Sequence, residues 1–221
     1  MRKFFFIFSI ILIPIIILLL NFRLYVFNTD YYHKEFARHS VYKMFNNGEL
    51  ENSLDDLFDY FKGKGELNKE FFNSKEILHL KDVKNLIKKT IKLFYISIVL
   101  LIIIFILLKD KNLIIKSSLY GSASTIIIIL FLFLVSSTNF SWYFLNFHYL
   151  VFSNNYWQLN PETDRLILMF PEEFFYDITT KIFFNSLIIS LVIMLILYTL
   201  KNKFKKSKPP KFDTTFKFKF I

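Results

Sequence analysis

The sequence contains no cysteine among its 221 residues. This excludes a disulfide, a thiolate metal site, a cysteine nucleophile and a lipid anchor on cysteine. Glycine is also scarce, with four in the chain, and no glycine-rich phosphate loop is present. The signatures of a Ser–His–Asp triad and of the zinc motif HExxH are missing as well. Any chemistry must therefore come from other side chains.

Hydrophobic residues are abundant instead: they make up 54% of the chain and gather in long runs, as in membrane proteins. Four runs can cross roughly 30 Å of hydrocarbon, at 4–27, 91–108, 117–135 and 182–200. Only helices satisfy their own backbone in lipid at these lengths. We therefore predict an all-α membrane protein with four transmembrane helices in a single integral membrane domain, 1–221. The first run is too long for a signal peptide and lacks a small-residue cleavage site, so we expect it to stay uncleaved.

Basic residues predict the orientation of these spans. The net charge is +10, and lysine and arginine gather at the N-terminus, between the second and third spans, and in the tail 201–221. The positive-inside rule places both termini in the cytoplasm and the connections 28–90 and 136–181 outside. Topology and anionic lipids thus account for the charge. We expect no nucleic-acid partner, because the chain has no folded basic domain.

Both outer connections carry amphipathic patterns. Apolar residues at helical spacing within Leu50–Phe61 predict a helix that Gly63 ends. A second helix is expected to begin at Ser74, as its N-cap, and to continue into the second span. The third connection is rich in Trp and Tyr, which favour the headgroup layer. Its stretch 160–164 predicts a turn in which Thr163 or Asp164 caps a short helix.

The four histidines all fall in the outer connections. His79 lies on the expected helix that begins near Ser74, and Asp82 follows three residues later on the same face. That carboxylate could fix the tautomer of His79 and raise its basicity. His148, in the aromatic stretch, is expected at the same membrane depth. Two imidazoles at one leaflet can deprotonate an amine and protonate a leaving alkoxide.

Plainer interpretations of the histidines remain open. Each of His79 and His148 also fits as an amphipathic side chain at the membrane interface. Metal binding by this pair is possible, but no ligand spacing supports it. His33 and His39 lie in a charged segment, and we expect both to be solvated.

Four sequence blocks carry a resemblance to a known family. The run EILHLKDVK at 76–84 and the run FHYLVF at 147–152 are similar to the two histidine motifs of the lipoprotein intramolecular transacylase (Lit) family. WQLNPETD at 157–164 and FPEEFF at 170–175 match the next two blocks of that family. Span number, chain length and motif order agree as well, so the resemblance covers almost the whole chain.

The resemblance implies an activity. The Lit family acts on lipoproteins whose N-terminal cysteine carries an S-diacylglyceryl group. It moves the sn-2 acyl chain from the glycerol oxygen to the cysteine α-amino group and gives the N-acyl S-monoacylglyceryl, or lyso, form. Both groups lie on one molecule, so no cofactor, acyl donor or metal is expected. The implied location is a bacterial cytoplasmic membrane, with the active site at the outer leaflet and lipoprotein and membrane lipids as partners.

We predict His79 and His148 as the catalytic pair and favour His79 as the base, because Asp82 can orient it. An acyl-histidine intermediate is an alternative. Trp157, Asn160 and Asp164 are further candidates for orienting the substrate or shaping the pocket, although turn and interface structure would also explain them.

Two other functional classes are weighed against this prediction. A non-catalytic membrane scaffold would hold a partner through the outer connections and would tolerate changes at both histidines. A small-solute transporter would need polar groups in mid-span or broken helices. The second and fourth spans have almost none, which argues against a transporter.

Overall fold

The computed structural model describes residues 1–46 and 48–206. Within these residues every regular element is helical, which confirms the all-α prediction. The elements are α1 (Arg2–Tyr25), α2 (Thr29–Arg38), the short 3-10 helix η1 (Val41–Met44), α3 (Glu49–Lys62), α4 (Ser74–Leu108), α5 (Lys111–Thr138), α6 (Phe140–Val151), α7 (Arg165–Met169) and α8 (Glu172–Lys206). The predicted tail 201–221 lies mostly outside the described residues.

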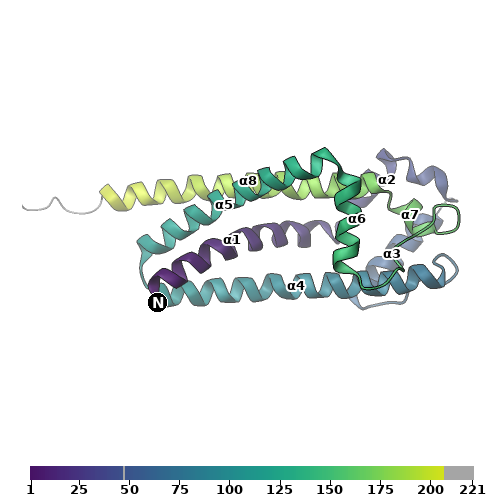
Figure 1. The fold of residues 1–221 in the computed structure, drawn as a ribbon, viewed down its shortest axis with the longest axis horizontal. Helices are drawn as coiled ribbons and strands as arrows, with labels where there is room; N and C mark the ends of the chain where they lie inside the picture. Colours follow the sequence, from purple (N-terminus) through teal and green to yellow (C-terminus); the bar gives the residue numbers. More distant parts are fainter. Residues whose placement is uncertain (47, 207–221) are drawn as a thin grey trace, which may run out of the picture.

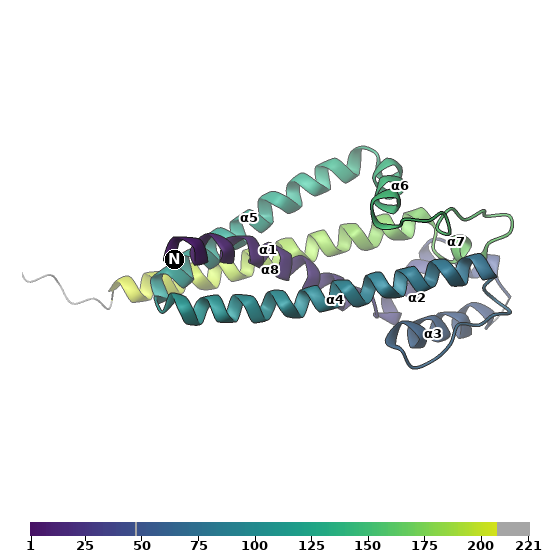
Figure 2. The same cartoon turned by 60° about the horizontal axis from the view of Figure 1, so that its bottom comes forward.

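Four helices, α1, α4, α5 and α8, are long and apolar enough to cross a membrane, as predicted. Helix α1 contacts the other three, and Figures 1 and 2 show it lying among them. Large apolar side chains on the outside of the bundle are exposed, for example Ile127, Leu134 and Leu195. Such a surface suits contact with lipid rather than water, so this is a multi-pass membrane protein.

Small and polar residues hold the inside of the bundle together. Gly121 on α5 lies so close to α1 that an added Cβ would come within 2.6 Å of Ile13. Asn21 on α1 is fully buried and donates a hydrogen bond of 2.8 Å from its Nδ2 to the hydroxyl of Ser186 on α8. Close backbone approach and interhelical hydrogen bonds are the usual means of helix association in lipid, where burial of apolar surface contributes little.

Helix α4 has 35 residues and is therefore roughly 52 Å long, well beyond the hydrocarbon thickness. The predicted span 91–108 is its second half, and the first half projects beyond it. The prediction that an amphipathic helix continues into this span is thus confirmed. The predicted cap was wrong by one residue: Asn73, not Ser74, accepts the N-terminal hydrogen bonds, and Glu76 completes a capping box.

The head of the molecule comprises α2, η1, α3, α6 and α7 with the loops between them, at one end of the bundle (Figure 1). Helix α3 occupies the predicted stretch and ends at Gly63, whose φ of 79° suits a glycine. The residues of its apolar stripe pack into a core shared with α2, α4, α7 and α8; this core includes Phe36, Leu54, Phe58, Phe72, Met169 and Phe174. The head is therefore built on a hydrophobic core of its own.

Helix α6 connects two sides of the molecule. At its start Phe140 packs against Tyr176 of α8, and near its end His148 approaches His79 of α4. Figure 1 shows that α6 runs at a steep angle to the long helices. The sequence indicated an aromatic interfacial stretch here, and the structure makes most of it a helix.

Candidate active site

The two predicted catalytic histidines lie together. His79 is on the buried face of α4 and is 7% exposed, and His148 is near the end of α6. Their ring centroids are 6.3 Å apart, and the ring planes are inclined by 37°. Two imidazoles at this separation can act on two atoms of one small reacting group.

Aromatic rings surround the pair. Phe152 lies against both imidazoles, with centroid distances of 5.1 Å to His79 and 5.7 Å to His148. Phe144 approaches His148 edge-on at 4.5 Å. Trp157, a predicted site residue, lies 5.0 Å from His148 with its ring tilted by 32°. This apolar shell strengthens electrostatic effects in the site and disfavours a charged imidazole.

Both imidazoles are held neutral. Burial, reinforced by the nearby His148, lowers the pKa of His79 from 6.5 to about 4, although Asp82 acts in the opposite direction. Burial also lowers the pKa of His148. A neutral imidazole has a lone pair on one ring nitrogen and can accept a proton near neutral pH.

A hydrogen bond fixes the tautomer of His148. Its Nδ1 lies 2.6 Å from the carbonyl oxygen of Phe144, one turn earlier on α6. Because a carbonyl oxygen can only accept, Nδ1 carries the proton and donates, which leaves the lone pair of the neutral ring on Nε2. The ring is thus oriented by its own helix.

Asp82 has another partner than the one predicted. Its Oδ2 accepts a hydrogen bond of 2.8 Å from Nδ2 of Asn154, in the loop after α6. The Nδ1 atom of His79 is buried and finds no hydrogen-bond partner within the described residues. The expected hydrogen bond between Asp82 and His79 is therefore not formed in this structure. Asn154, which the sequence did not single out, instead ties the loop after α6 to α4.

Asn160 and Asp164 lie in the predicted turn, and their hydrogen bonds stay within the turn or reach Asn73. Asp164 is 4% exposed and accepts hydrogen bonds of 2.8 Å from the Asn160 amide and from Nδ2 of Asn73. Burial would raise its pKa, but these hydrogen bonds and the ammonium of Lys75, 3.7 Å away, lower it. The turn precedes α7, and Asp164 occupies its N-cap position, one of the two predicted, but the Asp164 side chain makes no capping hydrogen bond to α7. Asp164 therefore fastens the loop before α7 to the start of α4, and Asn160 holds the turn itself.

Glu76 strengthens the same attachment and was missed as a site residue. It is 1% exposed, and its carboxylate accepts hydrogen bonds of 2.7 Å from the Asn73 amide and 2.6 Å from the Leu166 amide of α7. Glu76 lies one turn before His79 on the buried face of α4. The spacing N-x-x-E is a capping-box signal that the sequence offered. Glu76 therefore positions α7 against the helix that carries the catalytic candidate.

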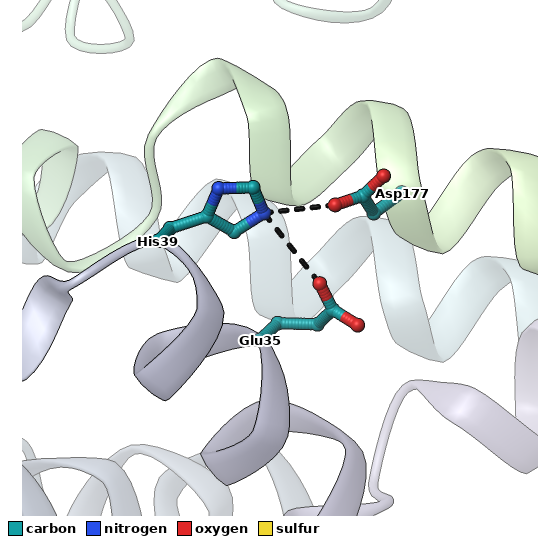
Figure 3. Close-up of side chains that lie close together, drawn as sticks. All are labelled: Glu35, His39 and Asp177. Atoms are coloured by element: carbon teal, nitrogen blue, oxygen red, sulfur yellow. Dashed lines mark hydrogen bonds and ion pairs between the residues drawn. The ribbon is translucent and has the colours of Figure 1, made fainter.

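The prediction that His33 and His39 are solvated was wrong. His39 is half-buried, and its Nε2 lies 2.8 Å from Oδ2 of Asp177 on α8 and 3.5 Å from Oε2 of Glu35 on α2 (Figure 3). The Nδ1 atom of His33 lies 2.6 Å from the hydroxyl of Tyr42. The acid that pairs with His39 lies far along the chain, so the local charge pattern gave no sign of it.

Comparisons with known proteins agree with this geometry. The family model described as lipoprotein intramolecular transacylase Lit matches residues 7–175. The in meso structure of the membrane integral lipoprotein intramolecular transacylase Lit from Bacillus cereus is 30% identical, with a TM-score of 0.84 over 94% of this chain and 99% of that one. A structure of that protein with a histidine-to-alanine mutation is similar too, at 29% identity and a TM-score of 0.80 over 94% and 96% of the two chains.

A further match comes from sequence similarity. An uncharacterized protein of Aquifex aeolicus (strain VF5) is 31% identical over 156 residues, which cover 68% of this chain and 67% of that protein. The family match includes both histidines, and the fold agrees over nearly the full length of both chains. The chain belongs to the lipoprotein intramolecular transacylase family.

Proposed function

We propose that this protein moves the sn-2 acyl chain of an S-diacylglyceryl-cysteine lipoprotein to the α-amino group of the same cysteine. The product is the lyso form, an N-acyl S-monoacylglyceryl lipoprotein. The observation that carries the proposal is the pair of neutral imidazoles, His79 and His148, 6.3 Å apart in an aromatic shell. Family membership supports the reaction class, since the family model is named for intramolecular transacylation.

In this proposal His148 is the base. Nε2 of His148 takes a proton from the α-ammonium, and the freed amine attacks the carbonyl carbon of the sn-2 ester. The hydrogen bond from Nδ1 to Phe144 supports this assignment, because it leaves the lone pair on Nε2. The sequence had favoured His79, but the contact with Asp82 that would have oriented it is replaced by the bond between Asp82 and Asn154.

His79 acts on the leaving group. The amine nitrogen forms the new C–N bond, the C–O ester bond breaks, and the glycerol oxygen needs a proton. On its way from ammonium to amide the nitrogen loses two protons. One is released to water, so each turnover releases one net proton, and the other is passed from His148 through His79 to the glycerol oxygen. A neutral His79, with its lowered pKa, can hold or relay this proton without retaining a charge. Attack by Nε2 on the ester to give an acyl-histidine is the alternative path.

The remaining candidates have supporting roles. Trp157 packs on the ring of His148 and restricts its rotation. Asp82 and Asn154 hold the first part of the connection between α6 and α7, while Asn160 and Asp164 hold its last part. Phe152 and Trp157 of this connection lie against the histidines, so we assign these four residues to positioning rather than to the reacting atoms.

Positioning explains why no cofactor or acyl donor is needed. The ester and the amine belong to one molecule, so their encounter is intramolecular and carries little entropic cost. We place the pair at the outer leaflet of a bacterial cytoplasmic membrane with both termini inside. The basic segments at 1–3, 109–116 and 201–206 support this orientation. A lipid-anchored substrate would present its ester and amine at that depth.

Mass spectrometry of lipoprotein N-terminal peptides tests the proposal. Cells that lack an endogenous transacylase and make diacylglyceryl lipoproteins should gain the lyso form when this protein is expressed. His79→Asn and His148→Asn should abolish the conversion at unchanged protein level, while His33→Asn should retain it. An unchanged diacylglyceryl form in cells with the wild-type protein would refute the activity. Retained conversion in both catalytic variants would refute the histidine mechanism, and loss of conversion only with loss of a bound partner would favour the scaffold.

A further inference from the structure

A second group of metal-ligating side chains lies away from the histidine pair, between α2 and α8. Glu35, His39 and Asp177 each offer one ligand atom, and these three atoms all lie within 4.8 Å of one another. Figure 3 shows the three side chains pointing toward one another. Glu35 is in the last turn of α2, His39 is the C-cap residue that follows this helix, and Asp177 is on α8. The group thus joins two parts of the chain, with 138 residues between His39 and Asp177.

The protein's own groups leave this cluster incompletely satisfied. Glu35 is 9% exposed, and its buried Oε2 finds no hydrogen-bond partner within the described residues. The nearest nitrogen atoms to this oxygen, Nη1 of Arg38 and Nε2 of His39, both lie 3.5 Å away. Burial and the neighbouring Asp177 raise the pKa of Glu35, as expected for two carboxylates that share a site. A buried carboxylate oxygen without a partner is costly unless a cation binds there.

We propose that Glu35, His39 and Asp177 bind one divalent transition-metal ion of the Zn²⁺ class. The Nε2 atom of His39 is 2.8 Å from Asp177 and 3.5 Å from Glu35. Ligands of a tetrahedral Zn²⁺ are roughly 3.3 Å apart, since each lies about 2.0–2.2 Å from the metal. One imidazole with two carboxylates suits Zn²⁺ or its neighbours better than Mg²⁺ or Ca²⁺, which prefer oxygen alone. Three protein ligands leave a fourth position for water.

Arg38 is the competing cation. Its Nη1 lies 3.0 Å from the same Oδ2 of Asp177 that faces His39, but its side chain is 64% exposed. It can therefore turn into solvent when a metal ion binds. Without it, the two carboxylates and a neutral imidazole carry a charge of −2, which a divalent ion balances. Arg38 stabilises the empty cluster and should weaken metal binding.

The cluster borders a cavity of about 840 Å³ that gives a metal ion a route in. Glu35, Arg38 and Asp177 line one part of it, and Ile129, Phe133 and Phe184 line the apolar part. Neither His79 nor His148 lines this cavity. The metal ion would thus act by joining α2 to α8 and stabilising the head, and the transacylation proposed above does not depend on it.

Zinc titration of the purified full-length protein, without an oligohistidine tag, tests the site. After treatment with a chelator, ZnCl₂ at 100-fold excess over its Kd should raise the unfolding midpoint by roughly 5–10 °C. Competition with a chromogenic chelator should give one ion per chain. His39→Asn and Asp177→Asn should weaken binding at least about tenfold, whereas His33→Asn, on the same helix, should bind as the wild type does. MgCl₂ should have no effect.

The Arg38→Gln variant distinguishes a metal site from an ion-pair network even if the variants at His39 and Asp177 fold poorly. If the cluster is an ion-pair network only, this variant is less stable and gains nothing from zinc. If it is a metal site, the variant is less stable without zinc but binds Zn²⁺ several-fold more tightly, because a competing charge is gone. Equal zinc affinity in all variants, or none in the wild type, would overturn the proposal. Lyso-form production by the wild-type protein with a chelator present is measured separately, so a failed metal site and a failed transacylase are distinguishable.

Discussion

Two clusters built around histidines lie in the head of the molecule, and their surroundings are opposite. His79 and His148 are enclosed by Phe144, Phe152 and Trp157, and neither imidazole pairs with a carboxylate within the described residues. His39 faces two carboxylates and lies beside an arginine. The same side chain is therefore kept neutral in one place and held among charges in the other.

The difference shows how packing decides what an imidazole can do. An apolar shell lowers the pKa of His79 and His148 and leaves lone pairs available for protons. An imidazole beside carboxylates can instead hydrogen-bond to them or, together with them, coordinate a metal ion. The first environment suits proton transfer, and the second suits a structural link between helices. Substitutions in one cluster at a time test whether the two environments have these separate roles.

The largest effect is expected on the rate of transacylation. General acid–base groups contribute on the order of 10²–10⁴ to a rate, so His148→Asn should lower the initial rate of lyso-form production at least about 100-fold. The unfolding midpoint in detergent should move little, because asparagine can still donate to the Phe144 carbonyl. Rates are followed by mass spectrometry on a purified diacylglyceryl lipopeptide. A variant that keeps more than a tenth of the wild-type rate would show that this cluster is not the catalytic one.

Acidification should destabilise the protein through His79. Its pKa is about 4 in the folded protein and 6.5 in the unfolded chain, so the unfolded chain binds more protons between these values. Stability from the neutral ring is therefore complete above pH 6.5 and falls as the pH drops toward 4, by on the order of 3 kcal/mol. Thermal unfolding from pH 7.5 to 4.5 should show a smaller loss for His79→Asn than for the wild type. Equal losses would mean that the ring is solvated.

Glu76 tests whether a carboxylate near the catalytic pair serves the imidazole or the backbone. Glu76→Gln leaves one acceptor where two backbone amides, of Asn73 and Leu166, now donate. The unpaired buried amide should cost about 1–3 kcal/mol of unfolding free energy. Denaturant unfolding measures the change, and Glu66→Gln, at an exposed glutamate, is the matched control. If Glu76→Gln changed the pH dependence of the rate but not the stability, the carboxylate would belong to the catalytic pair instead.

The sequence predicted the features that depend on local information. Apolar runs placed α1, α4, α5 and α8, and the amphipathic spacing after residue 74 predicted that α4 continues outward from the second span. The meeting of His79 with His148 was predicted through the expected topology and the family resemblance. Each of these follows from periodicity, length or motif order, none of which requires knowledge of tertiary packing.

Partner choice among polar side chains could not be predicted in the same way. Asp82 lies three residues after His79, yet it binds Asn154, 72 residues away. His39 pairs with Asp177 over an even longer separation, although acidic residues lie near it in sequence. Many acids could reach each partner, and only the packing of α6 and α8 selects among them. The length of α6 was also hidden, because its aromatic run has no clear polar face.

The smallest effect is expected at His39 when no metal ion is present. Its contact with Asp177 is partly exposed, and Nη1 of Arg38 lies 3.0 Å from the same carboxylate, so Arg38 should still hold Asp177 in a His39→Gln variant. Pairs of this kind contribute about 1 kcal/mol or less, so the unfolding midpoint should fall by no more than roughly 2–4 °C. His33→Gln, on the same helix but outside the cluster, is the control. A fall as large as that of Glu76→Gln would mean that the ionic cluster stabilises the head as strongly as the buried carboxylate does. The His39 cluster would then differ from the His79–His148 pair in its chemistry and not in a weaker contribution to stability.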